Sequence, residues 1–209
     1  MFPLGSVSRR ISGLPFVTLL IILMTSGVFY LELERGDAFI LRWSVIPAGI
    51  TTGAHPETLI TSAFLHGGWM HIIGNMIFLW AFAPPMEEAM SSFRFVIFYL
   101  VGAAVAMAAH VAGAPDSTIP ALGASGAVAA VMGAFLVTYP TDRIRTLVIL
   151  PPIIRIVYVP AVVLIGLWLL IQFASYSTEM SQADTGGVAY LAHIGGAVFG
   201  VVTGRLFLR

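Results

Sequence analysis

Six apolar stretches divide this chain of 209 residues, and they constrain its fold more than any other feature. Most approach the roughly 20 residues that a helix needs to cross a hydrocarbon layer about 30 Å thick. Lipid offers no partner for backbone N–H and C=O groups, so such a run has to form a helix. The stretches lie near residues 14–33, 67–86, 94–113, 125–139, 156–175 and 187–208. We therefore expect an all-α fold, a polytopic membrane protein with a bundle of six transmembrane helices.

Composition agrees with a lipid bilayer as the surrounding solvent. Hydrophobic residues make up 58% of the chain and charged residues only 10%, whereas soluble domains carry about 25% charged residues. Basic and acidic residues number ten each, so nucleic acid finds no electrostatic attraction. Cysteine is absent, which excludes disulfides, thiolate metal sites and cysteine catalysis. The first apolar run follows Arg9 and Arg10 as in a signal peptide, but its length favours a retained span.

Arginine supplies all the positive charge, and its distribution predicts the orientation in the membrane. Segments rich in basic residues remain on the cytoplasmic side. In a six-span arrangement one side holds Arg9, Arg10, Arg94, Arg143, Arg145, Arg155, Arg205 and Arg209, and the other only Arg35 and Arg42. We therefore expect a multi-pass protein with cytoplasmic N- and C-termini, and we assign it to a bacterial inner (plasma) membrane.

The fourth apolar stretch is shorter than a full span. From Ser125 to Tyr139 there are fourteen residue steps, about 21 Å at 1.5 Å per residue. If Tyr139 lies at the inner aromatic belt, Ser125 begins a helix below the outer surface and the preceding segment 114–123 dips into the membrane. Irregular backbone at that depth needs burial in protein or contact with water. The sequence therefore predicts an outward-facing, water-filled cavity with Ser125 at its floor.

Three further polar side chains reach about the same depth as this serine. His193 lies twelve residue steps before Arg205, and Asn75 lies twelve before Glu87, about 18 Å in each case. His71 precedes Asn75 by four residues, so both side chains lie on one face of their helix. We expect all four polar groups to share one cavity.

Ser125 and His193 fit the roles of nucleophile and general base. A serine hydroxyl is a weak nucleophile until a base accepts its proton, and neutral histidine does so near pH 7. A serine that begins a helix also directs free backbone N–H groups toward a developing oxyanion, and His71 and Asn75 add side-chain donors. No carboxylate lies at a matching depth to orient His193, so the pattern predicts a Ser-His dyad. Neither a metal site nor a cofactor is expected.

Small residues explain how the fourth and sixth stretches approach each other. Gly196 and Gly200 have the spacing that permits near backbone contact between membrane helices. Gly126, Ala130 and Gly133 offer a matching small surface. We therefore expect tight packing that holds the serine and the histidine within hydrogen-bonding distance.

Three ordered motifs resemble those of the rhomboid intramembrane serine proteases. They are residues 66–75 (HGGWMHIIGN) ahead of Glu87, residues 123–126 (GASG) followed by Gly133, and residues 192–196 (AHIGG) followed by Gly200. The resemblance covers essentially the whole chain and implies a single rhomboid-like membrane domain over residues 1–209.

The resemblance implies a serine endopeptidase that hydrolyses peptide bonds of transmembrane helices within or near the bilayer. Ser125 is then the nucleophile and His193 the general base and later acid. His71, Asn75 and the backbone N–H of Ser125 form the oxyanion hole. The implied partners are single-pass transmembrane protein substrates, which enter beside the second and fifth spans beneath a mobile cap at residues 176–187.

One position departs from the family pattern. Rhomboids often carry an aromatic residue four positions after the serine, packed on the catalytic histidine, and here that position is Ala129. Either another side chain fills the space or the His193 ring is more mobile. The alternative function is a catalytically silent rhomboid-like protein that binds membrane clients. A transporter or channel is disfavoured because the polar residues cluster in the outer half and complete no path. The oligomeric state is left open.

Overall fold

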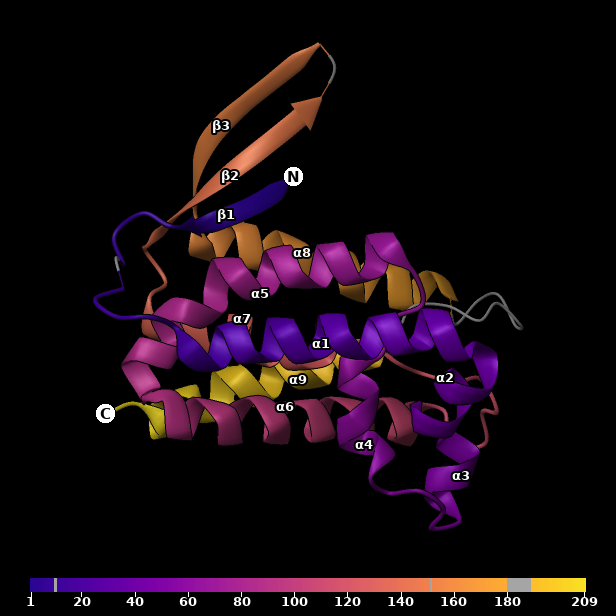
Figure 1. Ribbon diagram of the computed structural model, residues 1–209. Coiled ribbons are helices and arrows are strands. Elements are labelled where there is room, and N and C mark those ends of the chain that lie inside the picture. Colours follow the sequence, from indigo (N-terminus) through magenta and orange to yellow (C-terminus); the bar gives the residue numbers. More distant parts are fainter. Residues whose placement is uncertain (10, 151, 180–188) are drawn as a thin grey trace.

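The computed structural model describes residues 1–9, 11–150, 152–179 and 189–209, and Figure 1 shows the arrangement of its elements. In chain order these are β1 (Phe2–Ser6), α1 (Phe16–Arg35), α2 (Asp37–Trp43), α3 (Pro47–Thr51), α4 (Thr58–Thr61), η1 (Ser62–Phe64), α5 (Trp69–Met90), α6 (Ser92–Gly113), α7 (Ser125–Thr138), β2 (Arg143–Leu150), β3 (Ile153–Pro160), α8 (Ala161–Glu179), α9 (Tyr190–Thr203) and η2 (Gly204–Phe207). The long helices run side by side and form one bundle (Figure 1).

Helix α7 occupies the centre of this bundle. All residues from 126 to 135 are buried, and α7 contacts α5, α6, α8 and α9. In Figure 1 it lies behind α1, between α5 and α9. Alanine and glycine keep its surface narrow, so neighbouring helices can pack closely on several sides. The largest side chain in its buried stretch, Phe135, makes an edge contact with Phe82 of α5, with ring centroids 5.2 Å apart.

Glycine residues bring α7 and α9 into backbone contact. A methyl group added to Gly196 would collide with the carbonyl oxygen of Gly126, and one added to Gly200 would collide with that of Ala130. On α7, a methyl group on Gly133 would collide with the backbone of α9. The tight packing expected from the small-residue spacing is therefore confirmed.

Three of the described helical stretches are long and apolar enough to cross a membrane. They are Phe16–Arg35, Ser92–Gly113 and Tyr190–Phe207. Helix α7 and the part of α8 from Ala161 to Ala174 are shorter apolar helices, and α5 contains Pro84 and Pro85 as well as a buried carboxylate. The protein is thus a mostly helical membrane protein, while the count of six spans stays a prediction.

The expectation of an all-α fold is wrong in one region. Strands β1, β2 and β3 form an antiparallel sheet in that order. Residues 156–160, assigned above to the fifth span, belong to β3, so α8 begins only at Ala161. Along β2 the buried Ile144 and Thr146 alternate with the exposed Arg143 and Arg145. This period of two is the signature of a strand, and counting apolar residues alone conceals it.

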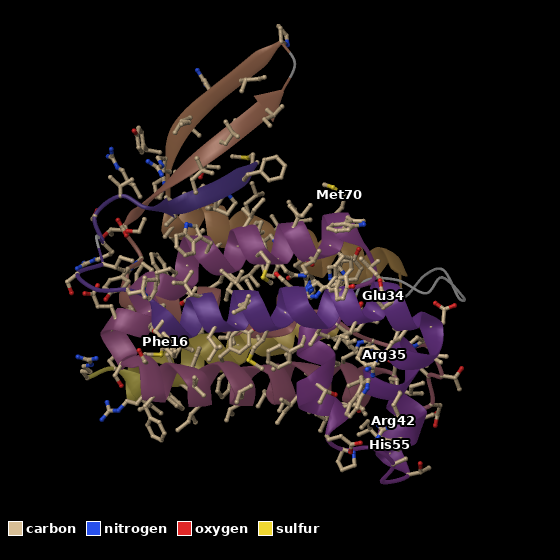
Figure 2. The ribbon with its side chains drawn as sticks, in the orientation of Figure 1. Phe16, Glu34, Arg35, Arg42, His55 and Met70 are labelled. Atoms are coloured by element: carbon tan, nitrogen blue, oxygen red, sulfur yellow. The ribbon has the colours of Figure 1, made fainter. Side chains whose placement is uncertain are left out.

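A buried carboxylate anchors the start of α1 to α5. Phe16 lies at one end of the bundle and Glu34 at the other (Figure 2). At the first end, Glu87 accepts hydrogen bonds from the backbone N–H groups of Val17 at 2.9 Å and Thr18 at 2.8 Å. It also accepts one from the Thr18 hydroxyl at 2.7 Å. The two N–H groups are donors that the first turn of a helix leaves without intrahelical acceptors, at the positive end of its dipole.

Helices α2, α3, α4 and η1 form a lobe at the other end of the bundle. Arg42 and His55 lie on this lobe (Figure 2), and their side chains contact the Glu57 carboxylate at 3.1 and 3.3 Å. An isolated antiparallel bridge between Val45 and Ala121 joins the lobe to the segment that precedes α7. The lobe therefore helps to fix the chain where it enters α7.

Candidate active site

The segment before α7 turns sharply into the helix that begins at Ser125. Gly123 has a φ of +126°, a conformation that side-chain-bearing residues rarely adopt. Its N–H group donates to the carbonyl oxygen of Ser62 at 2.9 Å. A methyl group here would also approach within 2.8 Å of the His71 ring. Both backbone conformation and space therefore require glycine two residues before the serine.

The structure brings Ser125 and His193 together. The Ser125 Oγ and His193 Nε2 atoms are 2.6 Å apart. On the other side of the ring, His193 Nδ1 lies 2.6 Å from Oε1 of Gln172 on α8. Gln172 and His193 are both buried. Three helices, α7, α8 and α9, thus contribute one side chain each to a continuous row of hydrogen bonds.

The direction of these bonds follows from the glutamine. A carbonyl oxygen can only accept, so Nδ1 of His193 carries the proton and donates it to Gln172. The lone pair on Nε2 is then free to accept the hydroxyl proton of Ser125. This tautomer is the one that a general base needs, and a neutral amide selects it where a carboxylate orients the histidine in a Ser-His-Asp triad.

Two aromatic side chains flank the His193 ring. The ring centroid of Trp168 lies 5.4 Å away, and that of Tyr190 lies 6.3 Å away in an edge-on arrangement. Ala129, the position that departs from the family pattern, is fully buried. Of the two outcomes left open by the sequence, the first is therefore found: other side chains fill the space beside the ring.

His71 and Asn75 lie on the same side of α5, as their spacing predicts. The Asn75 amide nitrogen donates to the His71 carbonyl oxygen at 3.1 Å. Gly67 donates its N–H to His71 Nδ1 at 3.3 Å, so Nε2 carries the proton of that ring. Neither side chain hydrogen-bonds to Ser125 among the described residues, which leaves the Nε2–H group of His71 as a free donor.

Four of these polar groups line one cavity of about 930 Å³. Ser125, His193, His71 and Asn75 share it with apolar side chains such as Phe78 and Trp168. The volume lies within the range of pockets that enclose most of a bound ligand. The expectation that the four groups meet in a single cavity is therefore confirmed.

His66 and Glu32 support the approach to the site. The backbone N–H of His66 donates to both carboxylate oxygens of Glu32 at 3.1 Å, and both residues are buried. The His66 ring lies edge-on to His71, with centroids 4.9 Å apart. These hydrogen bonds tie the backbone ahead of α5 to α1 through a buried carboxylate.

Sequence reasoning missed Gln172. It is the one hydrogen-bonding amide in the apolar run Ala161–Ala174, and a lone polar side chain at membrane depth is a signal of function. The predicted cap at residues 176–187 lies mostly outside the described residues. Within the described part of the chain, no group of three His, Cys, Asp or Glu side chains could hold a metal ion.

Fold and site together define a class of protein: a helical membrane protein with a hydrogen-bonded serine and histidine in an internal cavity. The chain belongs to the rhomboid family, because the model of the Rhomboid domain matches residues 54–209.

Two curated relatives are similar to this chain. It is 28% identical over 153 residues to "Rhomboid protein 1, mitochondrial" of Saccharomyces cerevisiae, which covers 70% of this chain and 40% of the relative. It is 28% identical over 202 residues to "RHOMBOID-like protein 12, mitochondrial" of Arabidopsis thaliana, which covers 89% of this chain and 56% of the relative. The chain thus spans about half the length of these relatives or less. Their mitochondrial names give no support to the bacterial inner membrane assigned from the sequence.

Proposed function

We propose that this protein is an intramembrane serine endopeptidase. The observation that carries the proposal is the row of hydrogen bonds from Ser125 through His193 to Gln172, with both distances at 2.6 Å. Membership of the rhomboid family supports a protease of this kind. The substrates would be single-pass transmembrane proteins, cut within or near the bilayer.

In this mechanism Ser125 Oγ attacks the carbonyl carbon of the scissile peptide bond. Its proton passes to Nε2 of His193, and the carbonyl π electrons move onto the oxygen. The resulting imidazolium then donates that proton to the leaving amine as the C–N bond breaks, which leaves an acyl-enzyme. Water, deprotonated by His193, attacks the ester carbon, and Ser125 recovers its proton when the acid product departs.

Three donors would stabilise the oxyanion in this mechanism. The backbone N–H of Ser125 lies in the first turn of α7, where it has no intrahelical acceptor. The Nε2–H group of His71 and the second amide proton of Asn75 complete the set, since both side chains line the cavity. Such donors act strongly because they are already oriented when the charge develops and need not reorganise.

The substrate route is also part of the proposal. Helices α5 and α8 each contribute side chains to the cavity, Phe78 from the first and Trp168 from the second. A transmembrane segment that unwinds locally would reach Ser125 between these two helices. No cofactor is required, because the chemistry uses only groups of this chain and water.

The test is covalent labelling of the purified protein with a fluorophosphonate. We expect labelling of the wild type and its loss in Ser125→Ala and His193→Ala. Ser117→Ala is the matched control, because Ser117 lines the same cavity and has no contact with His193 among the described residues. Labelling that survives Ser125→Ala would remove the proposed nucleophile. A wild type that is not labelled at all would favour the silent, client-binding alternative.

We further propose that both termini lie on the arginine-rich, cytoplasmic side. The chain has no cysteine, so a single introduced cysteine is the only thiol and no native cysteine has to be removed first. A membrane-impermeant maleimide added to intact cells should label Thr118→Cys and should label Thr141→Cys only after permeabilisation. The reverse pattern would invert the orientation.

A further inference from the structure

A second cavity lies on the face of α5 that points away from the candidate active site. It has a volume of about 800 Å³ and runs between α1 and α5, and we call it the α1–α5 groove. Helix α5 presents His71 and Asn75 to the active-site cavity and Ile72 and Met76 to the groove. The groove is therefore a separate site that shares only a helix with the first.

The groove is long enough for an acyl chain. Its lining on α1 extends from Ile22 to Leu33, eleven residue steps that rise about 16 Å. The lining on α5 includes Trp69 and Trp80, whose side chains are large, apolar and 63% and 45% exposed. An acyl chain of ordinary length would extend along this wall.

One end of the groove carries a single positive charge. Arg145 of β2 is exposed and is the only charged residue among the described residues that line the groove. It pairs with Gly5 of β1, and β1 lies alongside the half of α5 that leads to Met90 (Figure 1). Within the described part of the chain no carboxylate pairs with its guanidinium. Arginine binds phosphate through paired hydrogen bonds.

We propose that the α1–α5 groove binds one anionic glycerophospholipid. An acyl chain lies between α1 and α5, and the headgroup phosphate binds Arg145. Basic side chains beside membrane helices are suited to anionic headgroups. A zwitterionic lipid also carries a phosphate, but its ammonium group cancels the net charge that Arg145 attracts. The site does not depend on the proposed protease activity.

The natural tryptophans provide the readout. The chain has four, and two of them, Trp69 and Trp80, line the groove. Replacement of Trp43 and Trp168 by phenylalanine leaves only these two as fluorophores. The protein is purified in a mild detergent and titrated with brominated phosphatidylglycerol or brominated phosphatidylcholine, each of which quenches a tryptophan that it touches.

We expect phosphatidylglycerol to quench at a concentration about fivefold lower than phosphatidylcholine, since an anionic surface contributes about 1 kcal/mol per arginine. Arg145→Gln should abolish this preference. Arg155→Gln is the matched control: Arg155 is exposed on the same sheet but pairs with Val148, three residues from Arg145, so it lies on the opposite face.

Equal quenching by the two lipids in the unsubstituted reporter protein would overturn the proposal, whatever the variants do. It would also be overturned by Arg155→Gln if that change reduced the preference as much as Arg145→Gln. Thermal unfolding of both variants checks that they fold.

Discussion

A methyl group at Gly196 should separate α7 from α9 and disable the site without touching a catalytic side chain. Gly196 lies three residues after His193, against the backbone of Gly126, which follows Ser125. A Cβ atom there would overlap the Gly126 carbonyl oxygen and lie 3.0 Å from the carbonyl carbon. Both atoms belong to the backbone of a buried helix, so no side-chain rotation can relieve the contact.

The size of the effect follows from this geometry. Relief requires a helix displacement on the order of 1 Å, because close-packed interiors hold few voids. Overpacking of this kind costs about 1–3 kcal/mol, which lowers Tm by roughly 5 °C for a chain of this length. The same displacement lengthens the Ser125–His193 hydrogen bond, and a misplacement of about 1 Å can cost about 10²-fold in rate. We therefore expect Gly196→Ala to lose both stability and fluorophosphonate labelling.

Gly166→Ala is the matched control for this experiment. Gly166 lies within α8, and a Cβ atom there would meet nothing within 4 Å. Alanine is favoured over glycine inside a helix by about 1 kcal/mol, so this variant should be as stable as the wild type or more so. The assays are thermal unfolding in detergent and the rate of labelling. If Gly196→Ala behaved like Gly166→Ala, the argument for backbone contact between α7 and α9 would be refuted.

Three further changes test other contacts. Glu87→Gln removes the charge that binds the first turn of α1 and should lower the free energy of unfolding by about 2 kcal/mol, measured by thermal unfolding. Glu88→Gln, at an exposed position, should lower it by less than about 0.5 kcal/mol. Equal losses would contradict the anchoring role of Glu87. Gln172→Leu leaves His193 Nδ1 without its acceptor and should slow fluorophosphonate labelling roughly tenfold. An unchanged rate would exclude a positioning role for Gln172. Partial burial acts to raise the pKa of Asp142, but hydrogen bonds from Ser6, Ser8 and the Arg143 backbone lower it below its usual value. Its stabilising effect is therefore present above about pH 4 and lost as pH falls through the lower folded pKa. Asp142→Asn should lower Tm at pH 7 and differ less from the wild type below pH 4, and a difference that grew with acidity would have the wrong sign.

The helical part of the fold was predictable because its signals are local. The start of α7 at Ser125 and the glycine contacts of α9 follow from residue spacing, which fixes the side of a helix that a residue occupies. The sheet was not predictable in the same way. Residues 143–160 are rich in isoleucine and valine, and a short apolar run of this kind suits a strand or a helix equally well by composition.

The candidate site was predictable to a similar degree. Depth along the helices brought Ser125, His193, His71 and Asn75 to one level, and the structure places them in one cavity. Gln172 lay beyond this reasoning because its depth depends on where α8 begins, and the assumed start was five residues early. The support of the His193 ring by Trp168 and Tyr190 depends on the rotation of two helices, which spacing within one helix does not determine.

The sheet has a consequence for how the protein is made. Phe2 pairs with Leu147, so β1 has no partner strand until about 140 further residues have been synthesised. This takes roughly 7 to 30 s at 5–20 residues per second. During that time the helices between the two strands enter the membrane. The strands can pair only if they end on the same side, which requires an even number of membrane crossings between Ser6 and Arg143. The sheet therefore forms only in chains whose earlier helices have crossed the membrane an even number of times. In chains with an odd number of crossings, the edge of β2 would stay unpaired.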